Sequence, residues 1–230
     1  MAVNKSLFVV AFLITVFMLV TILLIGKILD ESRTKQLDVQ VRDLYEQFND
    51  FQTFFLMSQT YGDQMACLAF ENKIKEMDKS IWKLGQKIDQ YRAATEQFKK
   101  SEYYYDQKKT FNENQVLYLL LLKTLKDRCG YKQAIILFFY RNSEDCKKCD
   151  DQSFVLTDVN MDIDPEVAIF SFDMDLNITK INLLAKFYNT ASLPCITINE
   201  TVYCGIRDKN FIMKKLCETQ PTISVCEKYQ

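Results

Sequence analysis

A Cys-x-x-Cys sequence, Cys146-Lys147-Lys148-Cys149, holds the side chains of this chain that are best suited to chemistry. Two thiols three positions apart on a helix lie on one face, one turn apart, so they can close into a disulfide. A thiolate at a helix N-terminus is stabilised by the partial positive charge there, and the two lysines should lower the pKa of the Cys146 thiol further. Neighbouring carboxylates oppose this effect. We predict that Cys146 attacks and that Cys149 resolves the mixed disulfide.

The same pair has two other interpretations. It could be a permanent structural disulfide or an idle thiol pair. It could also be half of a metal site, which needs about four ligands and could recruit Cys195 as a third. The chain has no histidine, so Ser-His-Asp and Cys-His catalysis and imidazole zinc sites are excluded. We predict no metal and no dissociable cofactor, because thiol-disulfide exchange passes electrons without either.

The composition sets the class of protein and its compartment. A length of 230 residues allows one or two domains, and the even count of eight cysteines favours an oxidising compartment. The 29 basic and 30 acidic residues nearly balance, for a net charge of −1. We therefore expect no nucleic-acid partner.

The N-terminal segment Leu7–Ile25 has 19 residues without a charge, glycine or proline. At about 1.5 Å per residue it spans roughly 28 Å, the thickness of a hydrocarbon core. A cleaved signal peptide is the alternative, but its apolar region would be only about 7–15 residues long and a cleavage site would follow. We predict that residues 1–29 are a retained, single-pass anchor that contacts the lipid bilayer through this segment.

Two features of the sequence predict opposite orientations for this anchor. Lys27, Arg33 and Lys35 follow the apolar segment, and a positive-inside count would place the C-terminal bulk in the cytoplasm. The cysteines favour the opposite side, and Asn177 and Asn199 each begin an N-glycosylation triplet. We predict that the C-terminal domain is external.

Residues 30–130 are predicted to form an all-helical region, either a hairpin or a small bundle near the membrane. Apolar residues recur at helical spacing in the first two stretches, with a break at Gly62-Asp63 and a second helix that extends to Phe98. A third helix starts near Asn112 and stops at Gly130, so residues 101–114 are expected to join the second and third helices. The aromatic stripe is interpreted as core packing; a coiled coil that forms a homo-oligomer stays open as the alternative.

Residues 131–230 change to a mixed α/β pattern. Strand, helix and strand in succession predict a parallel pair, and the last two strands predict an antiparallel hairpin around Asn199-Glu200. A helix follows the Cys-x-x-Cys, and Asn177 is the expected N-cap of the next one. The predicted order is β-α-β-α-β-β-α, with strands at 133–140, 166–175, 193–198 and 201–205 and later helices at 177–190 and 208–218.

This order resembles the thioredoxin superfamily over about residues 131–217. The carrying residues are Cys146 and Cys149 at a helix start and the Leu193-Pro194 step that opens the hairpin. In that family the equivalent proline is cis and packs beside the dithiol, so the resemblance implies that Leu193 and Pro194 dock the substrate. The frequent Trp-Cys-Gly-Pro-Cys is Asp-Cys-Lys-Lys-Cys here, and Leu193 stands where Thr or Val is usual. These departures bear on redox potential and docking more than on fold.

The other six cysteines have a local pairing scheme. A two-residue turn at Asn199-Glu200 places Cys195 opposite Cys204, with Cα atoms about 4.5 Å apart, which allows a cross-strand bridge. The remaining candidates pair within the tail and between two helices. The predicted structural disulfides are Cys195–Cys204, Cys217–Cys226 and Cys67–Cys129.

The sequence thus predicts a membrane-anchored thiol-disulfide oxidoreductase of thioredoxin-like fold. Its substrates would be protein thiols or disulfides near the membrane surface, at a height set by the anchor and helices. A non-catalytic, membrane-tethered scaffold or binding protein is the alternative. The missing aromatic residue and proline around the dithiol favour that alternative, and a Cys146→Ser change that leaves function intact would support it.

Overall fold

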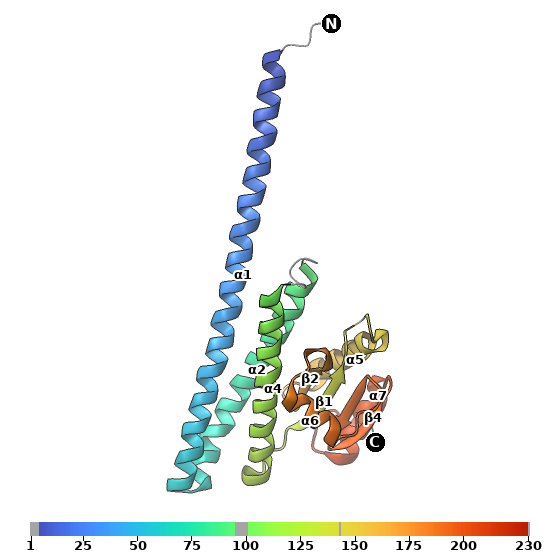
Figure 1. Ribbon diagram of the computed structural model, residues 1–230. Coiled ribbons are helices and arrows are strands. Elements are labelled where there is room, and N and C mark those ends of the chain that lie inside the picture. The colour runs from blue at the N-terminus through green and yellow to red at the C-terminus, as the bar shows by residue number, and fades with distance from the viewer. Residues whose placement is uncertain (1–4, 95–100, 143, 230) are drawn as a thin grey trace.

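The first helix, α1 (Lys5–Tyr61), carries both the apolar N-terminal segment and the first amphipathic stretch. The computed structural model describes residues 5–94, 101–142 and 144–229. Over these residues the protein is mixed α/β, with a four-stranded sheet and one N-terminal apolar helix (Figure 1). The boundary predicted at residue 29 is a change of composition within one helix. Phe98, the predicted end of the second helix, lies outside the described residues.

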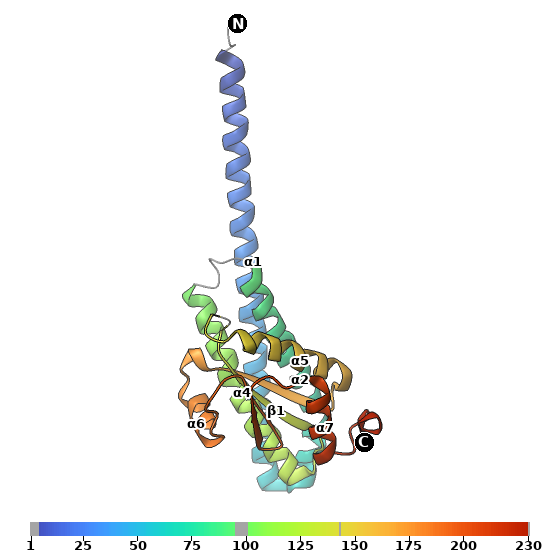
Figure 2. The same cartoon turned by 90° about the vertical axis from the view of Figure 1, so that its right-hand side faces the viewer.

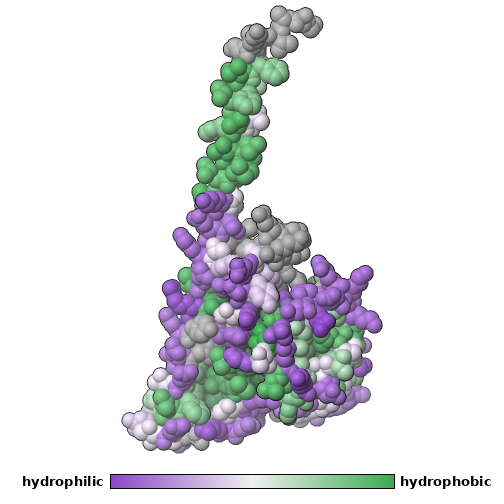
Figure 3. All heavy atoms as spheres, in the orientation of Figure 1, coloured by the Kyte–Doolittle hydropathy of each residue, from purple (hydrophilic) through white to green (hydrophobic). Residues whose placement is uncertain are grey.

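The apolar part of α1 is long and apolar enough to cross a membrane, and none of the residues in its most apolar window is buried. Figure 3 shows it as a hydrophobic rod that projects beyond a hydrophilic body. Its two threonines bond their hydroxyls back to the helix, from Thr15 to the Ala11 carbonyl at 2.9 Å and from Thr21 to the Phe17 carbonyl at 2.8 Å. Such internal pairing suits a segment that is surrounded by hydrocarbon.

Two further helices fold back against the second half of α1. They are α2 (Asp63–Ala94) and α4 (Glu102–Cys129), and together with residues 30–61 we call them the helical arm (Figure 1). The predicted break is confirmed, because Gly62 has a φ of +88° and reverses the chain. The buried side chains of the arm form one core; they include Leu37, Phe51, Phe70, Ile74, Met77, Leu119 and Leu122.

Helix α4 begins about ten residues earlier than the sequence predicts, so the expected connection at 101–114 is wrong. Ser101 caps the helix, since its hydroxyl accepts the Tyr104 N–H at 3.2 Å. The first turns bury Tyr104, Lys108 and Phe111 on one face, and the apolar pattern alone does not reveal this mixed face. Gly130 ends the helix in the left-handed region, with a φ of +65°, as predicted.

The sheet has the order β2-β1-β3-β4, with β1 and β2 parallel and the other pairs antiparallel. Helices α5 and α7 cover one face, and α4 and α6 cover the other (Figure 2). Side chains of β1 alternate between these two layers, which explains its continuous apolar run. The strands are β1 (Ala134–Tyr140), β2 (Val167–Asp173), β3 (Cys195–Ile198) and β4 (Thr201–Cys204), and the helices are α5 (Lys147–Ile163), α6 (Thr179–Phe187) and α7 (Lys209–Thr219).

Two local predictions around the sheet have different outcomes. Asn199 and Glu200 both have positive φ, at 45° and 69°, so they form the predicted two-residue turn and set Cys195 opposite Cys204. Asn177 is not an N-cap of α6. Its own φ is +48°, a conformation that asparagine tolerates, and it ends a short 3₁₀ turn (η1, Met174–Leu176). Ile178 occupies the N-cap position of α6.

Helix α4 also protects the exposed edge of the sheet. Strand β2 is an edge strand, and two of its outward N–H groups donate to amide side chains of α4. Ser171 donates to Gln115 Oε1 at 2.7 Å, and Asp173 donates to Asn112 Oδ1 at 3.0 Å. Covering an edge in this way satisfies its backbone and blocks pairing with another chain. The arm and the α/β domain are therefore joined by specific polar contacts as well as by packing.

Candidate redox site

The Cys-x-x-Cys pair forms a disulfide at the start of α5. Cys146 is the N-cap residue, its Cα lies 5.4 Å from that of Cys149, and the Cys149 N–H donates to the Cys146 carbonyl at 3.0 Å. The two side chains differ in exposure, because Cys149 is 1% exposed and Cys146 is half-buried. The free N–H groups of the first helical turn create a positive environment for a thiolate at Cys146.

A shallow groove of about 690 Å³ runs beside Cys146. Leu193 lines the same groove, and the Leu193–Pro194 bond is cis. Arg141 and Lys186 supply positive charge to its walls, and Asp145 supplies negative charge. The structure thus brings together Cys146 and the predicted docking residue Leu193. A partner bound in this groove would lie against the more accessible of the two sulfurs.

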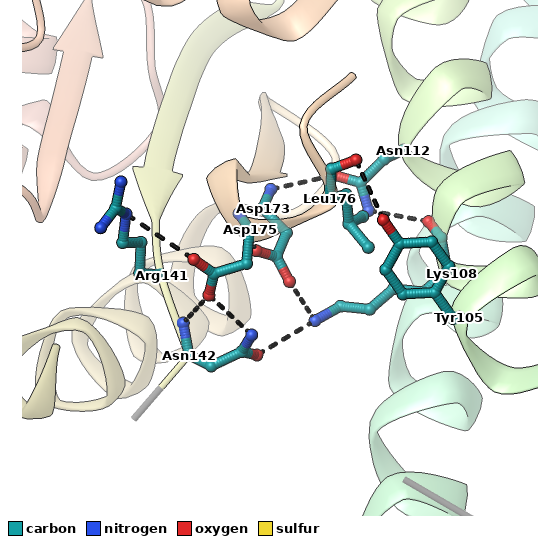
Figure 4. Close-up of polar contacts among 8 residues, drawn as sticks. All are labelled: Tyr105, Lys108, Asn112, Arg141, Asn142, Asp173, Asp175 and Leu176. Carbon is teal, nitrogen blue, oxygen red and sulfur yellow. Dashed lines mark hydrogen bonds and ion pairs between the residues drawn. The ribbon is translucent and has the colours of Figure 1, made fainter. Parts of the chain in front are cut away.

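The residues before Cys146 are held by a hydrogen-bonded junction at Asn142 (Figure 4). The Asn142 carbonyl accepts the N–H groups of Asp145 at 3.0 Å and Cys146 at 2.9 Å. Its own N–H and its side-chain amide donate to Asp175 Oδ2 at 2.8 Å and 2.7 Å. Arg141 Nε lies 3.6 Å from the other oxygen of Asp175. The start of α5 is therefore tied to the segment that follows β2.

A buried ion pair connects this junction to the helical arm. Lys108 of α4 is 5% exposed and pairs with Asp173, which is 1% exposed. Lys108 Nζ also lies 3.5 Å from Asn142 Oδ1 and 5.5 Å from the ring centre of Tyr140. The second oxygen of Asp173 accepts the Asp175 N–H at 2.9 Å. Two charges buried this far from water persist because each has a charged or polar partner.

The structure forms all three predicted structural disulfides. Cys195 and Cys204 bridge β3 and β4 with Cα atoms 4.0 Å apart. The other two bridges are Cys217–Cys226, at 5.4 Å between Cα atoms, and Cys67–Cys129, at 5.6 Å, which joins α2 to α4. The sulfur of Cys195 is engaged with Cys204, so it does not serve as the third metal ligand that we considered.

A second cavity, of about 380 Å³, lies between the arm and α5. Asp78 lines it beside Tyr118, and burial raises the pKa of the Asp78 carboxyl to about 6. A hydrogen bond from Gln133 Nε2, at 3.1 Å to Asp78 Oδ2, acts against this rise. Burial also raises the pKa of Tyr118, so its hydroxyl stays protonated. This carboxyl does not line the groove of Cys146 and lies outside the candidate redox site.

The glycosylation candidates lie on the surface of the α/β domain. Asn177 is exposed, and its side-chain oxygen accepts from Asn182 at 2.7 Å. Asn199 is half-buried in the hairpin turn. Both sit at turns with positive φ, where an attached glycan would not interrupt a helix or a strand.

Sequence reasoning missed the polar residues that join α4 to the domain. Lys108, Asn112 and Gln115 recur at positions i, i+4 and i+7, which places them on one helical face. A polar stripe of this kind could have been found in the sequence if residues 101–114 had been assigned to a helix. The partners on β2 could not have been found, because Lys108 and Asp173 are 65 positions apart.

Comparisons with known proteins identify no family. No family model matches the chain, and no curated protein matches it. A solved structure described as "Structure of a malarial protein" is 22% identical, with a TM-score of 0.31. The match covers 38% of this chain and 97% of that chain. A similarity at this level carries no argument about function, so the function rests on the site itself.

Proposed function

We propose that this chain is a membrane-anchored thiol-disulfide oxidoreductase with a thioredoxin-like domain. The observation that carries the proposal is the asymmetry of the pair: Cys146 lines an open groove at the N-terminus of α5, and Cys149 is 1% exposed. An attacking thiol needs access to its substrate and a positive environment, whereas a resolving thiol needs only to reach the first sulfur.

The surrounding domain supports the thioredoxin-like assignment. The dithiol follows β1 at a helix start, and the sheet has a parallel β1/β2 pair next to an antiparallel hairpin. The Leu193–Pro194 bond is cis, as is the equivalent bond of that superfamily, and Leu193 lines the groove of Cys146. The substrates we propose are protein thiols or disulfides, and Leu193 and Pro194 would contact their backbone.

Exchange at this site needs no cofactor. In the reducing direction, the Cys146 thiolate attacks a substrate disulfide, forms a mixed disulfide and releases one substrate sulfur as a thiolate, which takes up a proton. The Cys149 thiolate then attacks the Cys146 sulfur, closes the disulfide and releases the second substrate thiol. Two electrons and two protons pass from the pair to the substrate, and the reverse sequence oxidises a substrate dithiol.

The membrane part of the proposal rests on the apolar segment of α1, with Leu7–Ile25 in the bilayer. All eight cysteines follow that segment and are paired in the four disulfides. Disulfides persist in oxidising compartments, which supports an external C-terminal domain. The aromatic side chains of the helical arm pack against one another in its core, with the ring centres of Phe51 and Phe70 5.4 Å apart.

The test is the redox equilibrium of the pair in the full chain. The protein, purified in detergent, is equilibrated with reduced and oxidised glutathione, alkylated and mapped by mass spectrometry. A reversible two-electron couple between about −120 and −270 mV would support the proposal, because exchange catalysts lie in that range. A pair that stays oxidised below about −300 mV would be structural, and the proposal would fail.

The alternative is a non-catalytic, membrane-tethered binding protein built on the same domain. Asp145 precedes Cys146 where the resemblance would place an aromatic residue, and this observation favours the alternative. Full activity of a Cys146→Ser protein in its cellular setting would establish the alternative over the enzyme.

A further inference from the structure

The strongest unexplained feature outside the dithiol is the buried lysine that the helical arm inserts toward it. Lys108 belongs to α4, yet its amine meets Asp173 and Asn142 of the α/β domain. Its side chain is 7% exposed and that of Asp173 is 1% exposed. An ion pair this buried is costly to build, and replacing it by apolar residues is often neutral or stabilising. Packing of the arm against the domain therefore does not by itself explain why a charge is placed here.

The contacts of Lys108 form a closed ring. Lys108 pairs with Asp173, Asp173 Oδ1 accepts the Asp175 N–H at 2.9 Å, and Asp175 Oδ2 accepts from Asn142 at 2.7 Å. The ring closes where Lys108 Nζ lies 3.5 Å from Asn142 Oδ1 (Figure 4). Tyr105, one turn earlier on α4, adds a hydrogen bond to the Leu176 carbonyl at 3.3 Å. All of these contacts lie at the carboxyl ends of β1 and β2, the end of the sheet at which α5 begins.

One member of the ring holds the reactive cysteine. Both side-chain polar atoms of Asn142 are used by the ring, which fixes the side chain, and its N–H is held by Asp175 at 2.8 Å. Its carbonyl is then directed at the N–H of Cys146, at 2.9 Å. A lysine on the arm therefore acts on the Cys146 backbone through a single residue.

We propose that Lys108 is a positioning residue for the Cys146–Cys149 pair, so that docking of the helical arm sets the redox equilibrium of the dithiol. This inference rests on the proposed function and adds to it a residue that regulates the redox equilibrium. Holding Cys146 as the N-cap of α5 keeps its sulfur at the positive end of the helix, which stabilises the reduced, thiolate form. Loosening Asn142 removes that alignment, so the equilibrium moves toward the disulfide.

The chain offers a matched control on the same helix. Lys123 of α4 also reaches the α/β domain, where it lies 2.5 Å from Glu200 Oε1 and 3.0 Å from the Tyr188 hydroxyl. It lies about four helical turns from Lys108, and neither Glu200 nor Tyr188 lines the groove of Cys146. Loss of Lys123 weakens the attachment of the arm without touching Asn142.

The experiment compares full-length wild type, Lys108→Met, Asn142→Ala and Lys123→Met in the glutathione equilibrium described above. Lys108→Met and Asn142→Ala should shift the equilibrium constant toward the Cys146–Cys149 disulfide by about threefold or more, a range typical of residues that couple two sites. Lys123→Met should shift it by less than about twofold. Urea unfolding of each protein separates loss of stability from the shift in equilibrium.

The variants also distinguish failure of the positioning role from failure of the proposed function. Lys108→Met leaves Asp173 buried without its cation, so the double variant Lys108→Met/Asp173→Asn tests the same link in a folded protein. Asn142→Ala cuts the link and keeps the ion pair. Folded variants of Lys108 and Asn142 with the wild-type equilibrium would overturn the positioning role and leave the oxidoreductase intact. A wild-type pair that does not exchange at all would instead refute the proposed function.

Discussion

The two sulfurs of the dithiol face different surroundings, and this difference assigns an order to their reactions. Cys146 borders the groove, whereas Cys149 is 1% exposed. In the exchange reaction that we propose, a substrate can therefore bond only to Cys146, and the mixed disulfide is released only when Cys149 attacks. The order of events is a property of burial, independent of which substrate arrives.

A Cys149→Ser variant should accumulate a mixed disulfide between Cys146 and its substrates, because the releasing thiol is gone. Non-reducing gels and mass spectrometry of the full-length variant would detect the adducts. Cys146→Ser is the matched control and should trap nothing. A correctly folded Cys149→Ser protein that forms no adduct would contradict the assigned roles.

Asp78 makes stability depend on pH in the direction opposite to a salt-bridged carboxylate. Its pKa in the folded protein is about 6, raised by burial from a usual value of 3.8. The folded state therefore binds the proton more tightly, and stability falls as pH rises through this interval. Well above pH 6 the ionised group costs about 3 kcal/mol.

An Asp78→Asn change should remove that cost. The variant should be more stable than wild type by about 3 kcal/mol at pH 8, and the gain should shrink to about 0.5 kcal/mol at pH 4. Urea unfolding of both proteins at the two pH values measures the difference. An equal gain at both pH values would show that ionisation of Asp78 is not its cause.

Among the elements, α4 has the most varied role, because it packs against the rest of the arm, covers a sheet edge and contacts Asn142 beside the candidate redox site. Its amides at Asn112 and Gln115 take the place of a fifth strand along β2. Asn114 is equally buried, at 1% exposure, but neither polar atom of its side chain finds a hydrogen-bond partner among the described residues. The two asparagines should therefore respond differently to substitution.

Asn112→Ala should lower the free energy of unfolding by about 1–3 kcal/mol, because it leaves the Asp173 N–H buried and unpaired. Asn114→Leu should be neutral or stabilising, since it removes polar atoms that have no partner. Denaturant titrations of the two variants, side by side with wild type, measure both effects. A similar loss in the free energy of unfolding for both variants would mean that the hydrogen bond from the Asp173 N–H to Asn112 contributes no particular stability.

The strands of the domain could be predicted from sequence and the start of α4 could not, for physical reasons. β1 is covered on both faces, so its side chains form an uninterrupted apolar run. The hairpin register follows from a two-residue turn. The face of α4 that meets β2 is polar, because it satisfies the N–H groups of a sheet edge, and apolar periodicity does not detect such a face. The ring around Asn142 joins segments far apart in sequence, which no local pattern encodes.

For the whole molecule, the arm fixes how far the candidate redox site lies from the apolar segment. The Tyr103 hydroxyl at the start of α4 lies within hydrogen-bond distance of two acceptors, the Thr34 carbonyl at 3.0 Å and Asp38 Oδ1 at 2.9 Å. At about 1.5 Å per residue, this contact lies on the order of 15–20 Å beyond Ile25. The start of α4 lies at the end of the arm that is nearer the apolar segment (Figure 1). Lys108 follows Tyr103 within about two turns of α4 and contacts Asn142, whose carbonyl accepts the Cys146 N–H. Substrates with cysteines at a similar height above the membrane would fit best.

The disulfides predict the side of the membrane on which the domain lies. In sealed microsomes from cells that express the full chain, the C-terminal domain should resist added protease, and Asn177 should carry a glycan that Asn177→Gln removes. Detergent should make the domain sensitive to the protease, which serves as the control. Digestion in intact microsomes together with an unmodified Asn177 would place the domain in the cytoplasm.

Because α1 is one continuous helix from Lys5 to Tyr61, a tilt of its apolar end also tilts its far end. When its apolar end crosses a bilayer, residues 30–61 extend about 48 Å beyond it, and a tilt of about 20° moves the far end sideways by roughly 16 Å. A thicker bilayer holds such a helix more upright, and a thinner one tilts it further. Lipid composition would thereby set how far the end of α1 is displaced sideways, and so the distance at which one anchored molecule can contact neighbouring proteins.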